Sequence, residues 1–129
     1  MKTVGLDFET FYSSEFTLRK MTPVEYILDP RFEVIGCAVS DPDFLATHGV
    51  RTRFLSDQEL RDYLARLGAL PGKVIIVSHN ALFDMCILAW VYGYIPHIMA
   101  DTLGMARAML GHKLRSLSLA GSHQNLCGD

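Results

Sequence analysis

Two acidic residues near the amino terminus have the spacing of a metal site. Asp7 and Glu9 stand two apart in the segment LDFET, residues 6–10. Alternate side chains of an extended strand point to the same face, so the two carboxylates are expected about 7 Å apart. Mg²⁺ and Mn²⁺ prefer oxygen ligands and commonly bind through a few carboxylates together with substrate phosphates. Taken alone, so short a pattern is more simply explained as a solvated strand end.

A second polar pair follows an apolar segment in the middle of the chain. Asn80 and Asp84 stand four apart in SHNALFD, residues 78–84, and therefore share one face of a helix. In isolation, a helix cap followed by an ordinary surface aspartate accounts for them. Both pairs are nevertheless expected near the carboxyl ends of neighbouring strands, where open α/β sheets form their ligand crevices. Their coincidence favours one shared site.

The strands that would position these residues are short and alternate with helices. Strands are expected at residues 3–9, 33–40, 50–55, 74–77 and 98–100. The run from Val74 to Val77 is continuously apolar and β-branched, which is typical of a strand covered on both faces in the centre of a sheet. This order predicts an α/β protein with a mixed sheet and helices on its faces.

Capping residues predict where the helices begin. The expected first or capping residues are Thr22, Ser56, Asn80 and Asp101. The helix after Ser56 should bury Leu60, Tyr63, Leu64 and Leu67. The helix after Asn80 should turn inward Phe83, Cys86, Ile87, Trp90 and Val91. Leu114, Leu117 and Leu119 suggest one more helix.

Size and composition indicate a single globular domain over residues 1–129, half of whose residues are apolar. The formal charge of -2 excludes a protein that binds DNA by bulk electrostatic attraction. A nucleic-acid enzyme with bound divalent ions escapes that objection, because the ions supply positive charge. The first residues read as a strand and not as a leader peptide, and no apolar run reaches membrane length, so we expect no membrane partner and a cytoplasmic location. Cys37, Cys86 and Cys127 are expected to be reduced and structural.

Three motifs in order, LDFET, HNALFD and ADTLGMAR, resemble the DEDD-type 3′–5′ exonucleases, which have a ribonuclease-H-like fold. The opening stretch, with YILDPRFEVIG at residues 26–36, looks most like the proofreading domain of phage-type family A DNA polymerases. The resemblance covers nearly the whole chain. It implies a five-stranded mixed sheet, in which three antiparallel strands are joined by parallel ones, flanked by helices.

The resemblance also implies a chemistry. Asp7, Glu9 and Asp84 match the family's catalytic metal ligands, and the cofactors are two divalent metal ions, Mg²⁺ or Mn²⁺. Two such ions hydrolyse a phosphodiester bond by generating a hydroxide and by stabilising charge on the phosphate and the leaving oxygen. The substrate would be the 3′ end of single-stranded DNA, in a bacterial or phage-infected cell. Candidate substrate-binding residues are Phe8, Thr10, Phe11, Asn80 and Phe83, although Phe8 and Phe83 are more simply interpreted as core.

One motif of the family is not found. The family's third motif supplies a fourth aspartate and a general base on a late helix, whereas His123 and Asp129 are six apart and do not share a helix face. The domain is therefore interpreted as truncated before that motif, with a polymerase domain or the missing segment as a separate chain among its expected partners. The alternative is a catalytically incomplete module that binds nucleic acid or a protein through apolar surface, with residues 114–126 as the first place to look. DNA or RNA preference stays open, as does a ribonuclease H or another nuclease on the same fold.

Overall fold

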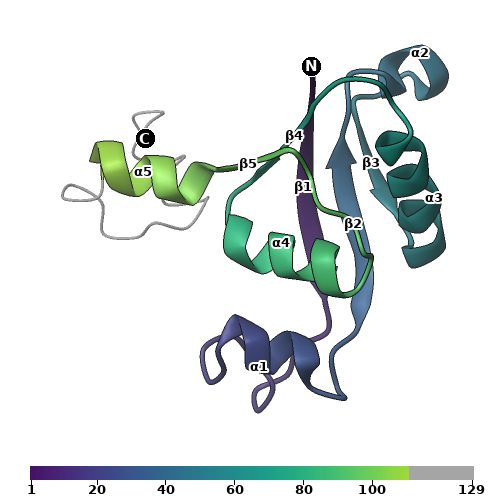
Figure 1. Ribbon diagram of the computed structural model, residues 1–129. Helices are drawn as coiled ribbons and strands as arrows, with labels where there is room; N and C mark the ends of the chain where they lie inside the picture. The colour runs from purple at the N-terminus through teal and green to yellow at the C-terminus, as the bar shows by residue number, and fades with distance from the viewer. Residues whose placement is uncertain (111–129) are drawn as a thin grey trace.

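A five-stranded mixed sheet forms the centre of the computed structural model, which describes residues 1–110 (Figure 1). The strands are β1 (Lys2–Thr10), β2 (Val34–Ser40), β3 (Thr52–Leu55), β4 (Val74–Ser78) and β5 (Ile98–Asp101). The helices are α1 (Pro23–Leu28), α2 (Phe44–His48), α3 (Asp57–Gly68), α4 (Ala81–Trp90) and α5 (Thr102–Leu110). The predicted strands and the four predicted helices within this range are confirmed.

The strand order is β3-β2-β1-β4-β5. β1 and β2 pair antiparallel, as do β2 and β3, whereas β1 with β4 and β4 with β5 pair parallel. The chain is thus an α/β protein whose mixed sheet is flanked by helices, an arrangement compatible with a ribonuclease-H-like fold. Because β1, β4 and β5 are parallel, their carboxyl ends meet at one edge of the sheet, as predicted.

Helix α2 was not predicted. It has five residues, too few to show a hydrophobic period, and Asp43 at its N-cap makes no side-chain capping hydrogen bond. It ends at Gly49, whose φ of 72° is left-handed, a conformation that glycine adopts without steric cost.

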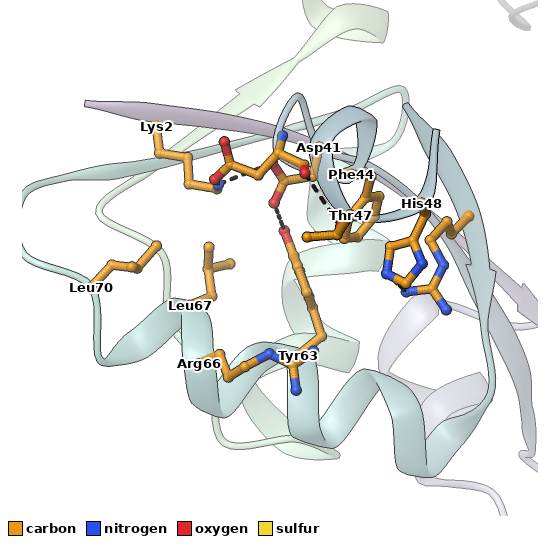
Figure 2. A pocket seen from close by; sticks show the side chains of 11 residues that line it. Lys2, Asp41, Phe44, Thr47, His48, Tyr63, Arg66, Leu67 and Leu70 are labelled. Atoms are coloured by element: carbon orange, nitrogen blue, oxygen red, sulfur yellow. Dashed lines mark hydrogen bonds and ion pairs between the residues drawn. The ribbon is translucent and has the colours of Figure 1, made fainter. Parts of the chain in front are cut away.

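Helix α2 and α3 enclose a pocket of about 380 Å³ at the amino end of β1 (Figure 2). Asp41 lies at its base, 2% exposed, and accepts hydrogen bonds from the Tyr63 hydroxyl at 2.6 Å and the Asp43 amide at 2.9 Å. The Lys2 ammonium lies 2.9 Å from the same carboxylate. Burial raises the pKa of Asp41, but these hydrogen bonds and the Lys2 charge outweigh it, and the pKa falls below its ordinary value.

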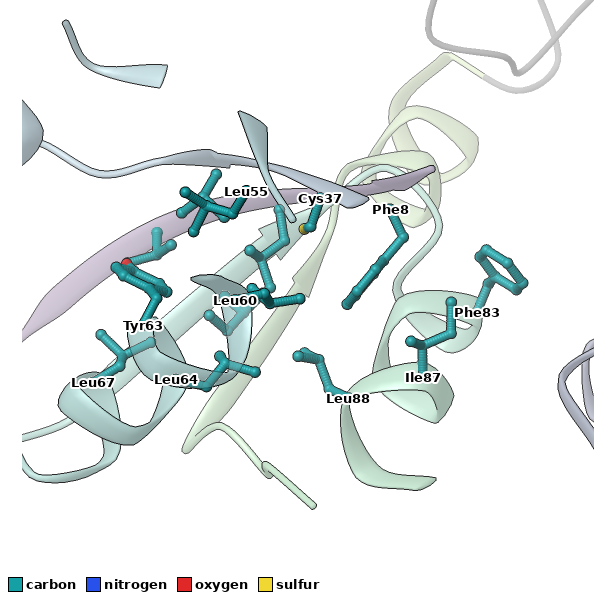
Figure 3. Close-up of a cluster of buried hydrophobic side chains, with 14 of the residues drawn as sticks. Phe8, Cys37, Leu55, Leu60, Tyr63, Leu64, Leu67, Phe83, Ile87 and Leu88 are labelled. Atoms are coloured by element: carbon teal, nitrogen blue, oxygen red, sulfur yellow. The ribbon is translucent and has the colours of Figure 1, made fainter. Parts of the chain in front are cut away.

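Helices α3 and α4 both pack against the same face of the sheet, and their apolar side chains meet there in one core (Figure 3). The predicted stripe of α3 is confirmed, since its buried residues are Leu60, Tyr63, Leu64 and Leu67. The Ser56–Glu59 capping box that starts α3 is also present. From the sheet, the core receives Val4, Leu6, Phe8, Cys37, Val39, Leu55 and Ile76.

The buried face of α4 differs from the prediction. Phe83 and Ile87 are buried as expected, and Leu88 joins them, but Trp90 is 49% exposed. Nearly every side chain of α4 is apolar, so periodicity alone does not select the buried side.

The opposite face of the sheet, here called the open face, lacks such a cover within residues 1–110. Its side chains alternate with those of the core, and Phe54 is 56% and Ile98 45% exposed. Ile75 and Val77 of β4 are half-buried, so the prediction that β4 is covered on both faces is wrong for the part of the chain described. Asp7 and Glu9 belong to this face.

No helix of the described chain has the length and apolar character needed to cross a bilayer.

Cys37 and Cys86 are free thiols. Burial raises the pKa of Cys37 to about 12, which makes it unreactive. Cys127, the segment 114–126 and the His123–Asp129 pair lie outside the described residues.

Candidate functional site

A pocket of about 470 Å³ lies where the carboxyl ends of the parallel strands meet. Both predicted acidic segments reach it, because β1 and β4 pair side by side with Gly5 opposite Val77. Its polar lining comes from β1, from the end of β4 and the residues after it, from the starts of α4 and α5, and from β2 and β3. These residues are Asp7, Ser40, Thr52, Ser78, His79, Asn80, Asp84 and Thr102.

Asp84 is the buried acid of this pocket. Only 4% of it is exposed, and its carboxylate accepts a hydrogen bond from the Ser78 hydroxyl. Burial raises its pKa to about 8, and the negative charges of Asp7 and Asp101 add to the shift. An added cation would relieve this repulsion, so the pocket is electrostatically suited to a positive ion.

The two acids of β1 are placed differently. Asp7 is exposed and lines the pocket, where its charge acts on Asp84. Glu9 is exposed on the same face of β1, as predicted. It lies two residues beyond Asp7 along the strand and does not line the pocket. The structure therefore brings together Asp7 and Asp84 but not Glu9.

Asn80 stands at the N-cap position of α4, yet its side chain makes no capping hydrogen bond. The expectation that it caps α4 through its side chain is therefore wrong. Asn80 is exposed and lines the pocket, so its amide is placed to contact a ligand there.

Hydroxyl groups link the end of β4 to the start of α5. The Thr102 hydroxyl donates to the Ser78 carbonyl at 3.3 Å and lies 3.0 Å from Nδ1 of His79. His79 at the end of β4 is thus hydrogen-bonded to the start of α5.

The aromatic candidates for substrate binding divide by exposure. Phe8 and Phe83 border the pocket but are 6% and 8% exposed, which confirms their interpretation as core residues. Phe11 is 40% exposed, so part of its ring is accessible to a ligand. The Thr10 hydroxyl lies 2.9 Å from the Tyr26 hydroxyl, a contact that fixes the end of β1.

Ser78, Asp101 and Thr102 were not predicted as site residues. Asp101 was assigned only a cap, and its carboxylate does accept from the Leu103 amide at 3.0 Å, yet it also raises the pKa of Asp84. Its place directly after the predicted strand at residues 98–100 was the available signal, whereas its register opposite Ser78 is known only from the structure. Nothing in the sequence indicated that Ser78 is buried.

No family model and no curated protein sequence matches the chain. The residues and their placement carry the functional case.

The fit of these residues to a divalent metal ion is partial. Within residues 1–110, no group of three or more His, Cys, Asp or Glu side chains is placed to hold a metal. Asp7 and Asp84 do supply hard oxygen donors across one pocket, and Mg²⁺ often binds through one or two carboxylates, waters and substrate phosphates. The described residues fit one such ion and offer no ligand set for a second.

Proposed function

We propose that this protein is a metal-dependent 3′–5′ exonuclease domain, acting on the 3′ end of single-stranded DNA, of the type that proofreads beside a polymerase. The observation that carries the proposal is the meeting of Asp7 and Asp84 in one pocket at the carboxyl edge of the sheet. The raised pKa of Asp84 supports it, because that carboxyl is buried beside two acids, a cost that a bound cation offsets. We also propose that the fold is ribonuclease-H-like.

Each residue has a role in this proposal. Asp7 and Asp84 would hold a Mg²⁺ or Mn²⁺ ion, and Glu9 is the candidate third ligand from the same strand face. The ion would supply Lewis-acid stabilisation of a phosphodiester and a water of lowered pKa. Asn80 would contact the substrate backbone, and the exposed ring of Phe11 would stack on a base, which contributes about 1–3 kcal/mol in single-strand binders.

The test is degradation of a single-stranded DNA oligonucleotide with Mn²⁺, followed on a 5′ label so that every shortened product stays visible. Stepwise loss from the 3′ end is expected, and EDTA or Asp7→Ala should abolish it. Asp43→Ala is the matched control, because Asp43 is an exposed acid at the other end of β1 and should leave the rate unchanged. A folded wild-type chain that leaves the oligonucleotide intact in Mn²⁺ would sink the proposal.

A second candidate, a nonhydrolytic interaction module, is favoured by the open face. Phe54 and Ile98 expose apolar surface there, and Asp7 and Glu9 make one end acidic. The strand residues of this face carry no Lys or Arg in the part described. The partner that fits is a protein surface that is apolar at its centre and basic at one end.

The two candidates give different results in the same assay. An exonuclease requires the metal and loses activity in Asp7→Ala, whereas an interaction module is indifferent to the metal. A folded chain without nuclease activity whose surface hydrophobicity drops in Phe54→Asp, but not in Leu82→Asp, supports the module, since Phe54 is 56% and Leu82 66% exposed. If both substitutions act equally, the open face has no special role.

A further inference from the structure

Ser78 is one of few polar residues in the interior. Among the side chains that the structure describes, the buried polar or charged ones are Asp41, Ser78 and Asp84. Ser78 is 4% exposed and ends β4 on the core side of the sheet. A buried hydroxyl without a partner is unfavourable, so the hydrogen bond to Asp84 contributes to keeping Ser78 in place.

The direction of this hydrogen bond follows from chemistry. In the ionised form that binds a metal, the carboxylate only accepts, so the Ser78 hydroxyl donates, and its acceptor is Oδ2 of Asp84. With Oδ2 held, rotation of the carboxylate about its terminal torsion is restricted, which narrows the directions that Oδ1 can take. Asp84 sits in the first turn of α4, where its backbone amide is bonded to the Asn80 carbonyl, so both ends of the side chain are anchored.

Ser78 is itself held in place from the next strand. Its residue pairs with Asp101 in the β4–β5 register, and its carbonyl accepts from the Thr102 hydroxyl at 3.3 Å. The donor to Asp84 therefore sits on backbone that is fixed by two neighbours. A rigid donor orients a carboxylate better than a surface hydroxyl or water does.

We propose that Ser78 is a positioning residue that orients the Asp84 carboxylate toward Asp7 for metal binding, an inference that rests on the proposed function. Ser78 itself touches neither metal nor substrate. Its hydroxyl selects which carboxylate oxygen is left to face the pocket. A purely structural hydroxyl would affect folding and leave metal affinity unchanged.

The experiment measures Mn²⁺ affinity of the full chain by electron paramagnetic resonance of the free ion, for wild type, Ser78→Ala and Ser78→Thr. Loss of an outer hydrogen-bond partner typically weakens metal binding about 10- to 100-fold, which is the change expected for Ser78→Ala. Ser78→Thr keeps the hydroxyl and should restore most of the affinity. Ser14→Ala is the control, because Ser14 is an exposed serine that does not line the pocket.

The nuclease assay supplies a second readout. Ser78→Ala should lower kcat at fixed Mn²⁺ and leave KM for DNA unchanged, since Ser78 does not meet the substrate. Equal Mn²⁺ affinity in wild type and Ser78→Ala overturns the inference while leaving the exonuclease proposal standing. A wild type that neither binds Mn²⁺ nor cleaves overturns both. If Ser78→Ala does not fold, Ser78→Cys decides, because its thiol is similar in size but a weaker donor, and unchanged affinity in that variant also overturns the inference.

Discussion

Two buried aspartates, Asp41 and Asp84, lie at opposite ends of the sheet and have opposite electrostatic surroundings. Asp41 is 2% exposed and has Lys2 and the Tyr63 hydroxyl beside it, and its pKa is lowered. Asp84 is 4% exposed, has the Ser78 hydroxyl and two neighbouring acids, and its pKa is raised to about 8. Burial raises the pKa of both carboxyls. At Asp41 the hydrogen bonds and the Lys2 charge outweigh it, whereas at Asp84 burial dominates and the neighbouring acids add to it.

The difference separates a structural acid from a functional one. Asp41 has its cation within the protein, as an ion pair that serves the fold. No cation is among the described groups that shift the pKa of Asp84. Asp7 and Asp101 raise that pKa further, in addition to the effect of burial. Strong perturbation by burial together with neighbouring acids, in a pocket, is typical of binding and catalytic sites.

The largest expected effect is on the structural acid. Asp41→Asn should lower the free energy of unfolding by roughly 2–4 kcal/mol, because Lys2 loses its buried counter-ion and Tyr63 its charged acceptor. Urea denaturation at pH 7 measures it. A loss under 1 kcal/mol would mean that the pair is no more than a surface contact.

The same variant has a pH signature. The pKa of Asp41 is lowered in the folded state, so its stabilisation is present above its ordinary pKa of 3.8 and is lost as pH falls through the folded value. The gap between wild type and Asp41→Asn should therefore close in acid below pH 3.8. A gap that stays constant from pH 7 into acid would contradict the ion-pair account.

Asp84→Asn should change the free energy of unfolding in the opposite direction from Asp41→Asn. The folded pKa of Asp84 is raised, so its favourable contribution is complete below pH 3.8 and is lost as pH rises toward about 8. In metal-free buffer above pH 8, the asparagine should stabilise the fold by roughly 1–3 kcal/mol, because no charge is buried. Thermal unfolding with EDTA measures the effect, with the exposed Asp62→Asn as control. Destabilisation above pH 8 would show that the ionised carboxylate is satisfied without a metal.

The sequence was sufficient where local chemistry decides. Ser56 and Glu59 predicted the start of α3, and the 3.6-residue period predicted its buried stripe, because both depend on residues within one or two turns. The meeting of Asp7 with Asp84 was also predictable, since parallel strands bring their carboxyl ends together. These are consequences of backbone geometry and not of packing detail.

The sequence was insufficient where tertiary packing decides. Trp90 was placed in the core, but α4 is apolar on all sides and its orientation is set by what it meets. Asn80 has the residue type of a cap without making the bond. The burial of Ser78 and the influence of Asp101 on Asp84 depend on strands far apart in the chain, so neither could be seen in a linear motif.

A smaller effect tests whether Asp84 accepts a metal. Mn²⁺ at ten times its dissociation constant should stabilise the wild type by about 1.4 kcal/mol, by binding the folded state alone. Asp84→Asn should lose this gain, and Asp41→Asn should keep it despite its lower baseline. The measurement is thermal unfolding with increasing Mn²⁺. Equal gains in all three proteins would place the ion somewhere other than this pocket.

The smallest expected effect concerns Asp43, the second acid beside Lys2. Its side chain is 80% exposed, so its pairing with Lys2 is screened by water, and Asp43→Asn should change the free energy of unfolding by less than about 1 kcal/mol. Its backbone amide still donates to Asp41 at 2.9 Å, and the substitution leaves that bond in place. Urea denaturation beside Asp41→Asn therefore separates burial from charge, because both residues face the same ammonium. A loss equal to that of Asp41→Asn would show that proximity to Lys2, and not burial, makes an acid structural in this protein.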